Sequence, residues 1–334
     1  FRLLDQLATY DRPTPLVVLT GGDPFERGDL AELTRYGTSL GLNVSLSPSV
    51  TPRLTRQRLE ALREAGGSAL SLSLDGATAA THDRFRGFEG TYAATLAAAR
   101  MVTDIGYRLQ INSTITAGNV REAPALLARV IELGAKLWSV FFLVPTGRGA
   151  GLGALTADQR EDVLHWLHDV SDRVAVKTTE APHYRRVVLQ KAAGTDTAEL
   201  GDLYRQLTEL TATALAGVPI RQRPARPPID VNAGRGFVFI DHQGKVYPSG
   251  FLPHVAGDVR QTPLPQIYRE ADIMRSLRTP TAFGGKCGQC EFADVCGGSR
   301  SRAYAVTGDP LASDPSCAYV PATCPSKTGD AVPG

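Results

Sequence analysis

The sequence predicts an α/β protein, a partial barrel of parallel strands and helices followed by a small cysteine-rich α+β domain. Short apolar runs alternate with amphipathic stretches from Leu16 to Val170, which is typical of strands joined by crossover helices. Polar residues and glycines follow most of these runs, and all five cysteines lie between Cys287 and Cys324. With 334 residues, 43% of them hydrophobic, the chain is long enough for one large and one small unit.

Five strands are expected in the first half, spaced by roughly thirty residues, the length of a βα unit. Polar clusters after four of the five favour a barrel, because a doubly wound sheet concentrates such residues at one switch point. The predicted strands are Leu16 to Leu19, Val44 to Leu46, Leu70 to Leu74, Leu109 to Ile115 and Trp138 to Val144.

Helix start signals lie between these runs. Asp29 and Thr55 are predicted N-caps, and Thr156 with Gln159 forms a predicted capping box. The segment from Arg2 to Thr9 is helix-like and precedes the first strand. Because a βα repeat opens with a strand, at least one unit is expected upstream of Phe1, and the chain is interpreted as a fragment.

Beyond Ser171 the alternation of strands and helices ends. Ala198 to Leu215 has a helical pattern, and the basic, proline-rich segment Arg221 to Pro228 is predicted to be a link. Gly236 to Pro248 is predicted to be a hairpin, and the tail from Pro325 to Gly334 is predicted to be disordered.

Composition excludes several classes of partner. Lys and Arg number 36 against 34 Asp and Glu, so there is no net charge suited to nucleic acid. No apolar run approaches the ~20 residues of a membrane helix, and no secretion signal is visible. A tight group of cysteines in a chain of this size indicates a metal site in a reducing compartment. The sequence therefore predicts a cytoplasmic protein with no nucleic-acid or membrane partner.

The spacing of the cysteines is the most specific motif. A C-x2-C pair, a third cysteine five residues further and a fourth twenty residues on can converge on a zinc ion or an iron-sulfur cluster, with free buried thiols as the remaining alternative. The candidate ligands are Cys287, Cys290, Cys296 and Cys317, and Cys324 is spare.

Polar residues near the predicted strand ends are candidate ligand contacts. The glycines of Thr20 to Pro24 allow close approach to backbone groups, although a turn without a ligand gives the same pattern. Ser71, Ser73 and Asp75 alternate with leucines and thus share one face, which lines a polar cavity or meets solvent. Asn112 interrupts the fourth strand in the same way.

Two further features have an ordinary structural alternative. Arg84 and Arg86 follow Asp75 and are able to clamp a carboxylate, or else belong to a solvated loop. His183 is a candidate acid or base, or else a structural histidine.

Taken together and in order, these motifs resemble the radical S-adenosylmethionine (SAM) enzymes that carry a C-terminal SPASM or twitch auxiliary-cluster domain. Gly21 to Pro24 resembles the GGEP-type motif of that family, Ser71 to Gly76 its ribose-contacting strand, and Cys287 to Cys317 its cluster domain. Phe141 to Gly149 and Tyr247 to Pro253 further resemble the branch of haem-biosynthetic proteins, with the mycofactocin and PQQ peptide maturases as kin.

The resemblance implies a (β/α)6 partial barrel that binds SAM at the carboxyl ends of its strands. A [4Fe-4S] cluster would reduce SAM to a 5′-deoxyadenosyl radical, which abstracts hydrogen from a peptide or tetrapyrrole side chain. A flavodoxin or ferredoxin would supply electrons. The residues that the resemblance assigns to SAM are Gly21, Gly22, Asp23, Pro24, Ser49, Ser73, Asp75, Asn112 and Val144.

Two departures from the family pattern limit what this chain does by itself. The C-x3-C-x2-C motif of the SAM-cleaving cluster is absent, since no cysteine precedes Cys287, and it is expected upstream together with the missing first strand. A full seven-cysteine auxiliary domain would have a cysteine near Ser249 and one at Arg300, and neither is present here. The resemblance therefore implies a single auxiliary [4Fe-4S] cluster, on the four candidate cysteines.

The predicted units are a barrel over 1–175, a helical linker region over 176–228, an auxiliary iron-sulfur domain over 229–324 and a tail over 325–334. The predicted function is that of a radical SAM oxidoreductase or maturase. The alternative is a non-catalytic barrel, stabilised by zinc, that binds a nucleotide-like ligand.

Overall fold

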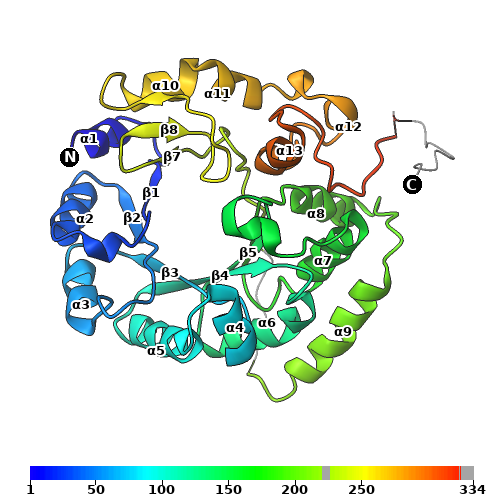
Figure 1. Ribbon diagram of the computed structural model, residues 1–334, viewed down its shortest axis with the longest axis horizontal. Helices are drawn as coiled ribbons and strands as arrows, with labels where there is room; N and C mark the ends of the chain where they lie inside the picture. Colours follow the sequence, from blue (N-terminus) through cyan, green and yellow to red (C-terminus); the bar gives the residue numbers. More distant parts are fainter. Residues whose placement is uncertain (220–225, 323, 325–334) are drawn as a thin grey trace.

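The computed structural model describes residues 1–219, 226–322 and 324. Most of the predicted link from Arg221 to Pro228 and the whole predicted tail from Pro325 lie outside these residues. Figure 1 shows a curved sheet with helices along its outside, and the C-terminal elements pass across the open side of the curve.

A six-stranded parallel sheet in the order β1-β2-β3-β4-β5-β6 forms the barrel. This sheet confirms the predicted α/β partial barrel, and all five predicted strands are present within two residues of their expected ends. The strands are β1 Leu16–Leu19, β2 Asn43–Leu46, β3 Ala69–Ser73, β4 Arg108–Ile115, β5 Leu137–Phe142 and β6 Val176–Thr179.

Strand β6 corrects the sequence prediction, which placed 176–228 in a helical linker. Val176–Thr179 has the sequence VKTT and only one apolar residue, so it lacks the apolar core of the other strands. It pairs with β5 alone and lies at the edge of the sheet. An edge strand need not be apolar on both faces, which is why its pattern is weak.

The two faces of the sheet differ in chemistry. Leu70 and Leu72 of β3 are fully buried under the helices, whereas Ser71 and Ser73 are half-buried on the opposite, concave face. Alternation by two therefore separates an apolar outer face from a polar inner face. The helices are α1 Arg2–Ala8, α2 Leu30–Ser39, α3 Arg56–Glu64, α4 Ala79–Arg86, α5 Thr91–Asp104, α6 Ala123–Glu132, α7 Ala157–Asp169, α8 His183–Ala193 and α9 Asp202–Ala214.

The capping predictions hold at two of three helices. Thr55 accepts a hydrogen bond from the Arg58 backbone at the start of α3, and the Thr156–Gln159 capping box opens α7. Asp29 precedes α2 but does not cap it with its side chain. Its carboxylate instead accepts two hydrogen bonds from the Arg27 guanidinium, at 2.9 and 2.7 Å, because a charged partner outcompetes a backbone amide.

The C-terminal part is built on a three-stranded antiparallel sheet, β7 Phe239–Ile240, β8 Lys245–Tyr247 and β9 Gly257–Asp258. The β7–β8 pair confirms the predicted hairpin, and β9 was not expected from the sequence. Short helices follow: α10 Leu264–Glu270, α11 Asp272–Leu277, α12 Gly285–Gly288 and α13 Arg300–Thr307.

The N-terminal helix α1 lies beside α10 of the C-terminal part (Figure 1). The Leu264 backbone amide donates a 2.7 Å hydrogen bond to Gln6 Oε1, and Arg2 Nη2 donates one of 3.1 Å to the Val259 carbonyl. Leu3 and Leu7 of α1 also pack against the apolar cluster beneath the hairpin. These contacts hold the C-terminal part across the concave side of the sheet.

A buried ion pair joins α7 to α8. Arg186 Nη2 donates to both carboxylate oxygens of Glu161 at 2.6 Å, and His165 Nε2 lies 3.1 Å from Glu161 Oε1. Burial alone raises the pKa of Glu161, but the hydrogen bond from His165 and the charge of Arg186 outweigh it and lower the pKa from 4.5 to about 2.

This depressed pKa predicts an acid-sensitive part of the stability. Because the folded pKa of Glu161 lies below its unfolded value, the stabilisation is present above about pH 4.5 and is lost as pH falls towards 2. At 1.36 kcal/mol per pKa unit, the loss is roughly 3 kcal/mol. Urea unfolding of the wild type and Glu161→Gln should show a stability gap that narrows over this range. A gap that does not change with pH contradicts the assignment.

Candidate functional site

The loops after β1 and β2 come together at the carboxyl edge of the sheet. Asp23 Oδ1 caps a short 3₁₀ helix, Pro24–Glu26, by accepting from the Phe25 amide at 3.1 Å. The same carboxylate accepts from Thr51 Oγ1 at 3.0 Å and from the Ser49 amide at 3.4 Å. Ser49 Oγ in turn donates to the Gly22 carbonyl at 3.4 Å. Several residues that the sequence assigned to SAM therefore share one location.

Asp75, also assigned to SAM, is almost fully buried and its carboxylate bonds within the protein. Oδ1 accepts from the Thr114 amide at 2.7 Å, and Oδ2 lies 2.5 Å from Arg86 Nη2. Asn119 Nδ2 donates to the Asp75 carbonyl at 2.8 Å. Arg84 and Arg86 lie on α4 rather than in the expected loop, and Arg86 clamps a carboxylate of the protein itself. These bonds tie the end of β3 to β4.

A row of polar residues crosses the middle of the concave face. Ser73 of β3 is in register with Asn112 of β4, which is in register with Ser139 of β5 and, beyond it, Lys177 of β6. Asn112 Oδ1 accepts from Gln110 Nε2 at 2.6 Å. The sequence identified Ser73 and Asn112 but missed Lys177, because β6 was not recognised as a strand.

Apolar side chains lie on the same concave face. Leu16 and Val18 of β1 are 61% and 45% exposed, although their neighbours Val17 and Leu19 pack under the helices. At the other side of the sheet, Phe141 meets Phe251 of the C-terminal part edge to face, with ring centroids 6.5 Å apart. Exposed apolar groups beside a polar row are typical of a ligand-binding surface.

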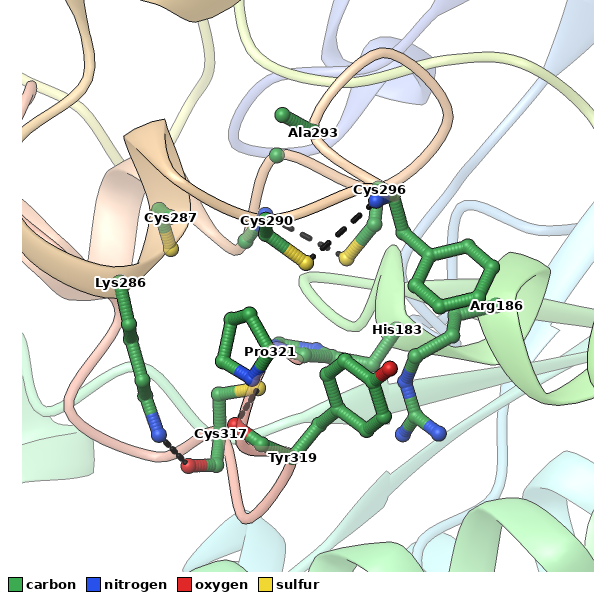
Figure 2. Close-up of a pocket in the computed structure, with 13 residues that line it drawn as sticks. His183, Arg186, Lys286, Cys287, Cys290, Ala293, Cys296, Cys317, Tyr319 and Pro321 are labelled. Carbon is green, nitrogen blue, oxygen red and sulfur yellow. Dashed lines mark hydrogen bonds between the residues drawn. The ribbon is translucent and has the colours of Figure 1, made fainter. Parts of the chain in front are cut away.

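The four predicted cysteine ligands line one cavity, with an empty volume of about 340 Å³ that is partly open to solvent. Figure 2 shows their sulfur atoms turned toward the same space. His183, Arg186 and Tyr319 also line it. Cys324 is not among the lining residues, and its thiol donates to Gln289 Oε1 at 3.2 Å.

Hydrogen bonds to the sulfurs show that this cavity suits a cluster. The backbone amides of Asp314, Phe292 and Gly298 each donate at 3.4 Å to a cysteine sulfur, and such bonds are typical around iron-sulfur clusters. Among the residues that the structure describes, no three His, Cys, Asp or Glu side chains are placed to hold one metal ion. Four cysteines that line one cavity supply the four thiolates that a [4Fe-4S] cluster takes.

Burial keeps the thiols protonated unless metal is bound. Burial raises the pKa of Cys296 to about 12 and that of Cys317 to about 11, and it also raises the pKa of Cys290. A metal must therefore displace these protons when it binds, so cluster assembly releases protons and is pH-dependent.

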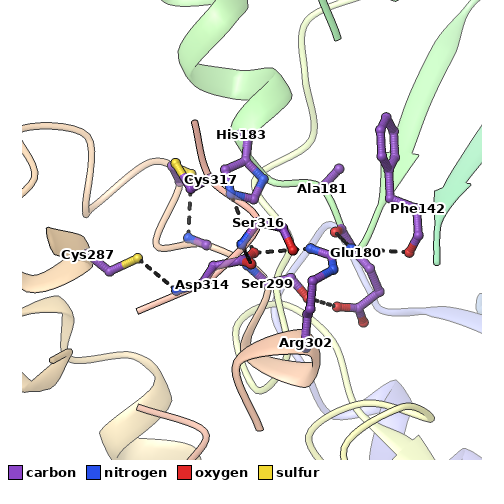
Figure 3. Close-up of polar contacts among 12 residues, drawn as sticks. Phe142, Glu180, Ala181, His183, Cys287, Ser299, Arg302, Asp314, Ser316 and Cys317 are labelled. Atoms are coloured by element: carbon purple, nitrogen blue, oxygen red, sulfur yellow. Dashed lines mark hydrogen bonds and ion pairs between the residues drawn. The ribbon is translucent and has the colours of Figure 1, made fainter. Parts of the chain in front are cut away.

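A buried network joins the cysteine loops to the ends of β5 and β6 (Figure 3). Arg302 Nη1 lies 3.1 Å from Asp314 Oδ2, and its Nη2 donates to the carbonyls of Phe142 and Glu180 at 3.2 and 2.8 Å. Asp314 carries the amide that bonds Cys287. Val144, assigned to SAM, follows this end of β5 and is buried.

Glu180 is the second centre of this network. Its carboxylate accepts hydrogen bonds from Ser249, Ser299 and Ser301 at 3.2, 2.5 and 2.9 Å. Its backbone φ of 56° lies in the left-handed region, which a side chain of this size adopts rarely and at a cost. Ser249, near which the family pattern has a cysteine, thus holds the C-terminal part to the barrel.

His183 has the position of a structural histidine rather than that of a catalytic acid or base. It is buried, its Nε2 lies 3.4 Å from Asp314 Oδ2, and it lines the cysteine cavity. Burial lowers the pKa of His183 to about 4 even though Asp314 opposes the shift. The imidazole is therefore neutral near pH 7.

Comparison with known proteins agrees with this architecture. The radical SAM superfamily matches residues 2–128. AdoMet-dependent heme synthase of Methanosarcina barkeri is 38% identical over 320 residues, 95% of this chain and 86% of that protein. PqqA peptide cyclase of Rhodopseudomonas palustris is 30% identical over 318 residues, 91% of this chain and 74% of that protein.

A solved structure shows the same fold. Streptococcus suis SuiB bound to S-adenosylmethionine has a TM-score of 0.66 at 14% identity, covering 95% of this chain and 69% of SuiB. The chain belongs to the radical SAM superfamily, whose cofactors are S-adenosylmethionine and [4Fe-4S] clusters, and it is an enzyme. In the described residues no helix is long and apolar enough to cross a membrane.

Replacing cavity cysteines should remove the cluster selectively. Cys287→Ser and Cys296→Ser take away thiolate ligands, so protein purified anaerobically should lose most of its bound iron and sulfide. Cys324→Ser is the matched control, because that thiol is not among the residues lining the cavity, and it should keep wild-type iron. Iron and sulfide analysis decides this. Equal loss in all three variants, or zinc without iron in the wild type, contradicts the assignment.

Proposed function

We propose that this protein acts on an iron porphyrin and converts propionate side chains to vinyl groups, as a heme-forming radical SAM enzyme. The stronger similarity to AdoMet-dependent heme synthase, 38% identity against 30% for the peptide cyclase, supports a tetrapyrrole over a peptide. The observation that carries the proposal is the concave face, where exposed apolar groups lie on the same face as a cation that has no acidic partner.

Lys177 is that cation. It lies in the polar row of the concave face, in register with Ser139, and has no salt bridge among the described residues. Burial and the nearby Arg226 guanidinium both lower the pKa of Lys177, and no carboxylate raises it. Two like charges without a counter-ion favour binding of an anion. Propionate groups on a flat apolar ring suit this combination with Leu16, Val18 and Phe251.

The proposed conversion of propionate to vinyl determines which groups the substrate site must provide. Conversion of one propionate to a vinyl group removes a hydrogen atom, a CO₂ molecule and one electron. The bound cofactors would supply a 5′-deoxyadenosyl radical for the hydrogen atom and a one-electron acceptor at the cysteine cavity. The chain's own residues hold the ring against β1 and β5, pair with the carboxylates and keep water from the reacting carbon.

The contacts to SAM are part of the same proposal. Gly21, Gly22 and Asp23 would meet the methionine amino group, and Ser49 and Ser73 the ribose or carboxylate. The hydrogen bonds that join Gly22, Asp23 and Ser49 at the carboxyl edge support this. Asn112 and Val144 would lie by the nucleoside, while Pro24 and Asp75 shape the loops. A flavodoxin or ferredoxin in the cytoplasm is the proposed reductant.

Turnover tests the function directly. A full-length protein that carries C-x3-C-x2-C should convert Fe-coproporphyrin III to heme when given SAM and reduced flavodoxin under anaerobic conditions. Mass spectrometry would detect heme and 5′-deoxyadenosine together. SAM cleavage without any change in the porphyrin contradicts the proposed substrate. Failure to form 5′-deoxyadenosine from SAM contradicts the radical chemistry.

The charge of Lys177 is expected to contribute to the affinity for the porphyrin carboxylates. Lys177→Met should weaken binding of coproporphyrin III at least tenfold, because one charge-assisted bond of roughly 1.5–3 kcal/mol is lost. Lys177→Arg should bind nearly as the wild type does, and exposed Lys136→Met is the matched surface control. Absorbance titration measures each dissociation constant. The tetramethyl ester should bind the wild type and Lys177→Met equally. If Lys177→Met binds the free acid as tightly as the wild type does, the assignment of Lys177 is wrong.

A further inference from the structure

Arg300 is a fully buried arginine beside the cysteine cavity, at 0% exposure. Its Nη1 donates to the carbonyls of Pro310 and Ala312 at 3.1 and 2.7 Å, and Nε donates to that of Gly298 at 3.4 Å. The remaining nitrogen, Nη2, lies 3.6 Å from Cys287 Sγ and donates to it. Every acceptor of this guanidinium is therefore a neutral carbonyl except the cysteine sulfur.

No carboxylate within the described part of the chain forms a salt bridge with Arg300, and the neighbouring Asp314 is paired with Arg302. Arg302 and Arg186, two other buried arginines near the cavity, differ in this respect. Arg302 is paired with Asp314 at 3.1 Å, and Arg186 is paired with Glu161 at 2.6 Å. Removing an unpaired cation from water costs several kcal/mol, and carbonyl dipoles alone rarely offset this. The protein thus retains a buried positive charge that faces Cys287.

The local backbone is built to allow this approach. Gly298 has a φ of 66°, and a Cβ there would lie 2.7 Å from Arg300 Nη2 and 3.2 Å from Cys287 Sγ. The ring of Phe283 lies 4.5 Å from the guanidinium carbon and covers its other side. A side chain at residue 298 would separate Arg300 from the cavity, so glycine keeps the cation against the sulfur.

We propose that Arg300 is the counter-charge and sulfur hydrogen-bond donor of the auxiliary cluster, and that it raises the reduction potential of that cluster. The inference rests on the cluster proposed for the cysteine cavity, but not on the identity of the substrate. Four thiolates give a [4Fe-4S] cluster a net negative charge in both states. Reduction adds one more negative charge, so a fixed cation stabilises the reduced state more than the oxidised state.

This role fits the position of Arg300 in the family pattern. The resemblance implies a cysteine at this position, where this chain has a cation. A higher potential makes the remaining cluster a better electron acceptor. Substrate oxidation, in which one electron leaves the side chain with CO₂, requires such an acceptor.

Redox titration of the auxiliary cluster tests the proposal without substrate. All cysteines in the sequence of this chain lie from Cys287 onward. A redox titration of this chain therefore detects the auxiliary cluster alone. Arg300→Gln retains an N–H donor and removes the charge, whereas Arg300→Lys retains the charge and loses the planar fork. The control is Arg275→Gln, because Arg275 is exposed on α11 and paired with Asp272.

Arg300→Gln should lower the midpoint potential of the cluster. The electron paramagnetic resonance signal of the reduced cluster measures this potential during the titration. The expected ratio of reduced to oxidised cluster at a fixed potential falls at least tenfold, which corresponds to 59 mV for one electron. Arg300→Lys should change this ratio by less than about threefold, and Arg275→Gln should leave it unchanged. A midpoint in Arg300→Gln equal to that of the wild type overturns the proposal.

Iron content separates an electrostatic role from a purely structural one. If Arg300→Gln fails to hold its cluster, Arg300→Lys decides, because a counter-charge is kept only in the lysine variant. Iron retained in Arg300→Lys and lost in Arg300→Gln supports the proposal, and equal loss in both overturns it. Neither result depends on heme formation, so failure of the proposed substrate leaves this test intact.

Discussion

The hydrogen bonds and the ion pair of the Arg302 guanidinium are the interactions on which the rest of the structure depends. This side chain is 1% exposed and joins the carbonyls at the end of β5 and after β6 to the carboxylate of Asp314. Removal of either charge would leave the other buried without a partner, which typically costs 3–5 kcal/mol. The pair therefore fixes the cysteine loops against the carboxyl edge of the barrel, where the proposed SAM and substrate sites lie.

Of four cations near the proposed cluster and substrate sites, two are paired with carboxylates and two have no acidic partner among the residues that the structure describes. Arg302 and Arg186 each have a carboxylate and therefore serve the fold, since their charges are already balanced. Arg300 and Lys177 have no acidic partner in the described residues, and each faces a place where a bound group would bring negative charge: the cluster for Arg300 and the substrate for Lys177.

The sequence predicted the parts of the molecule that depend on local pattern. Alternation in Leu70 to Asp75 gave the correct faces of β3, and spacing gave the four cysteines that line one cavity. Parts that depend on tertiary contacts were not predictable: β6 has one apolar residue, so Lys177 could not be placed on the concave face. Glu180 and Arg302 belong to no motif, since several of their partners are distant in the chain: Ser299 is 119 residues from Glu180, and Phe142 is 160 residues from Arg302. Asp29 shows that a capping signal fails when Arg27 competes for the carboxylate.

Anomalous X-ray diffraction at the iron edge, on anaerobically grown crystals, tests the central claim most directly. The claim is that one [4Fe-4S] cluster occupies the cysteine cavity and is held against the barrel by the Arg302 network. The account predicts iron density within bonding distance of Cys287, Cys290, Cys296 and Cys317, with Arg300 beside the Cys287 sulfur. A single zinc peak in the cavity, or iron bound elsewhere with this cavity empty, would contradict it.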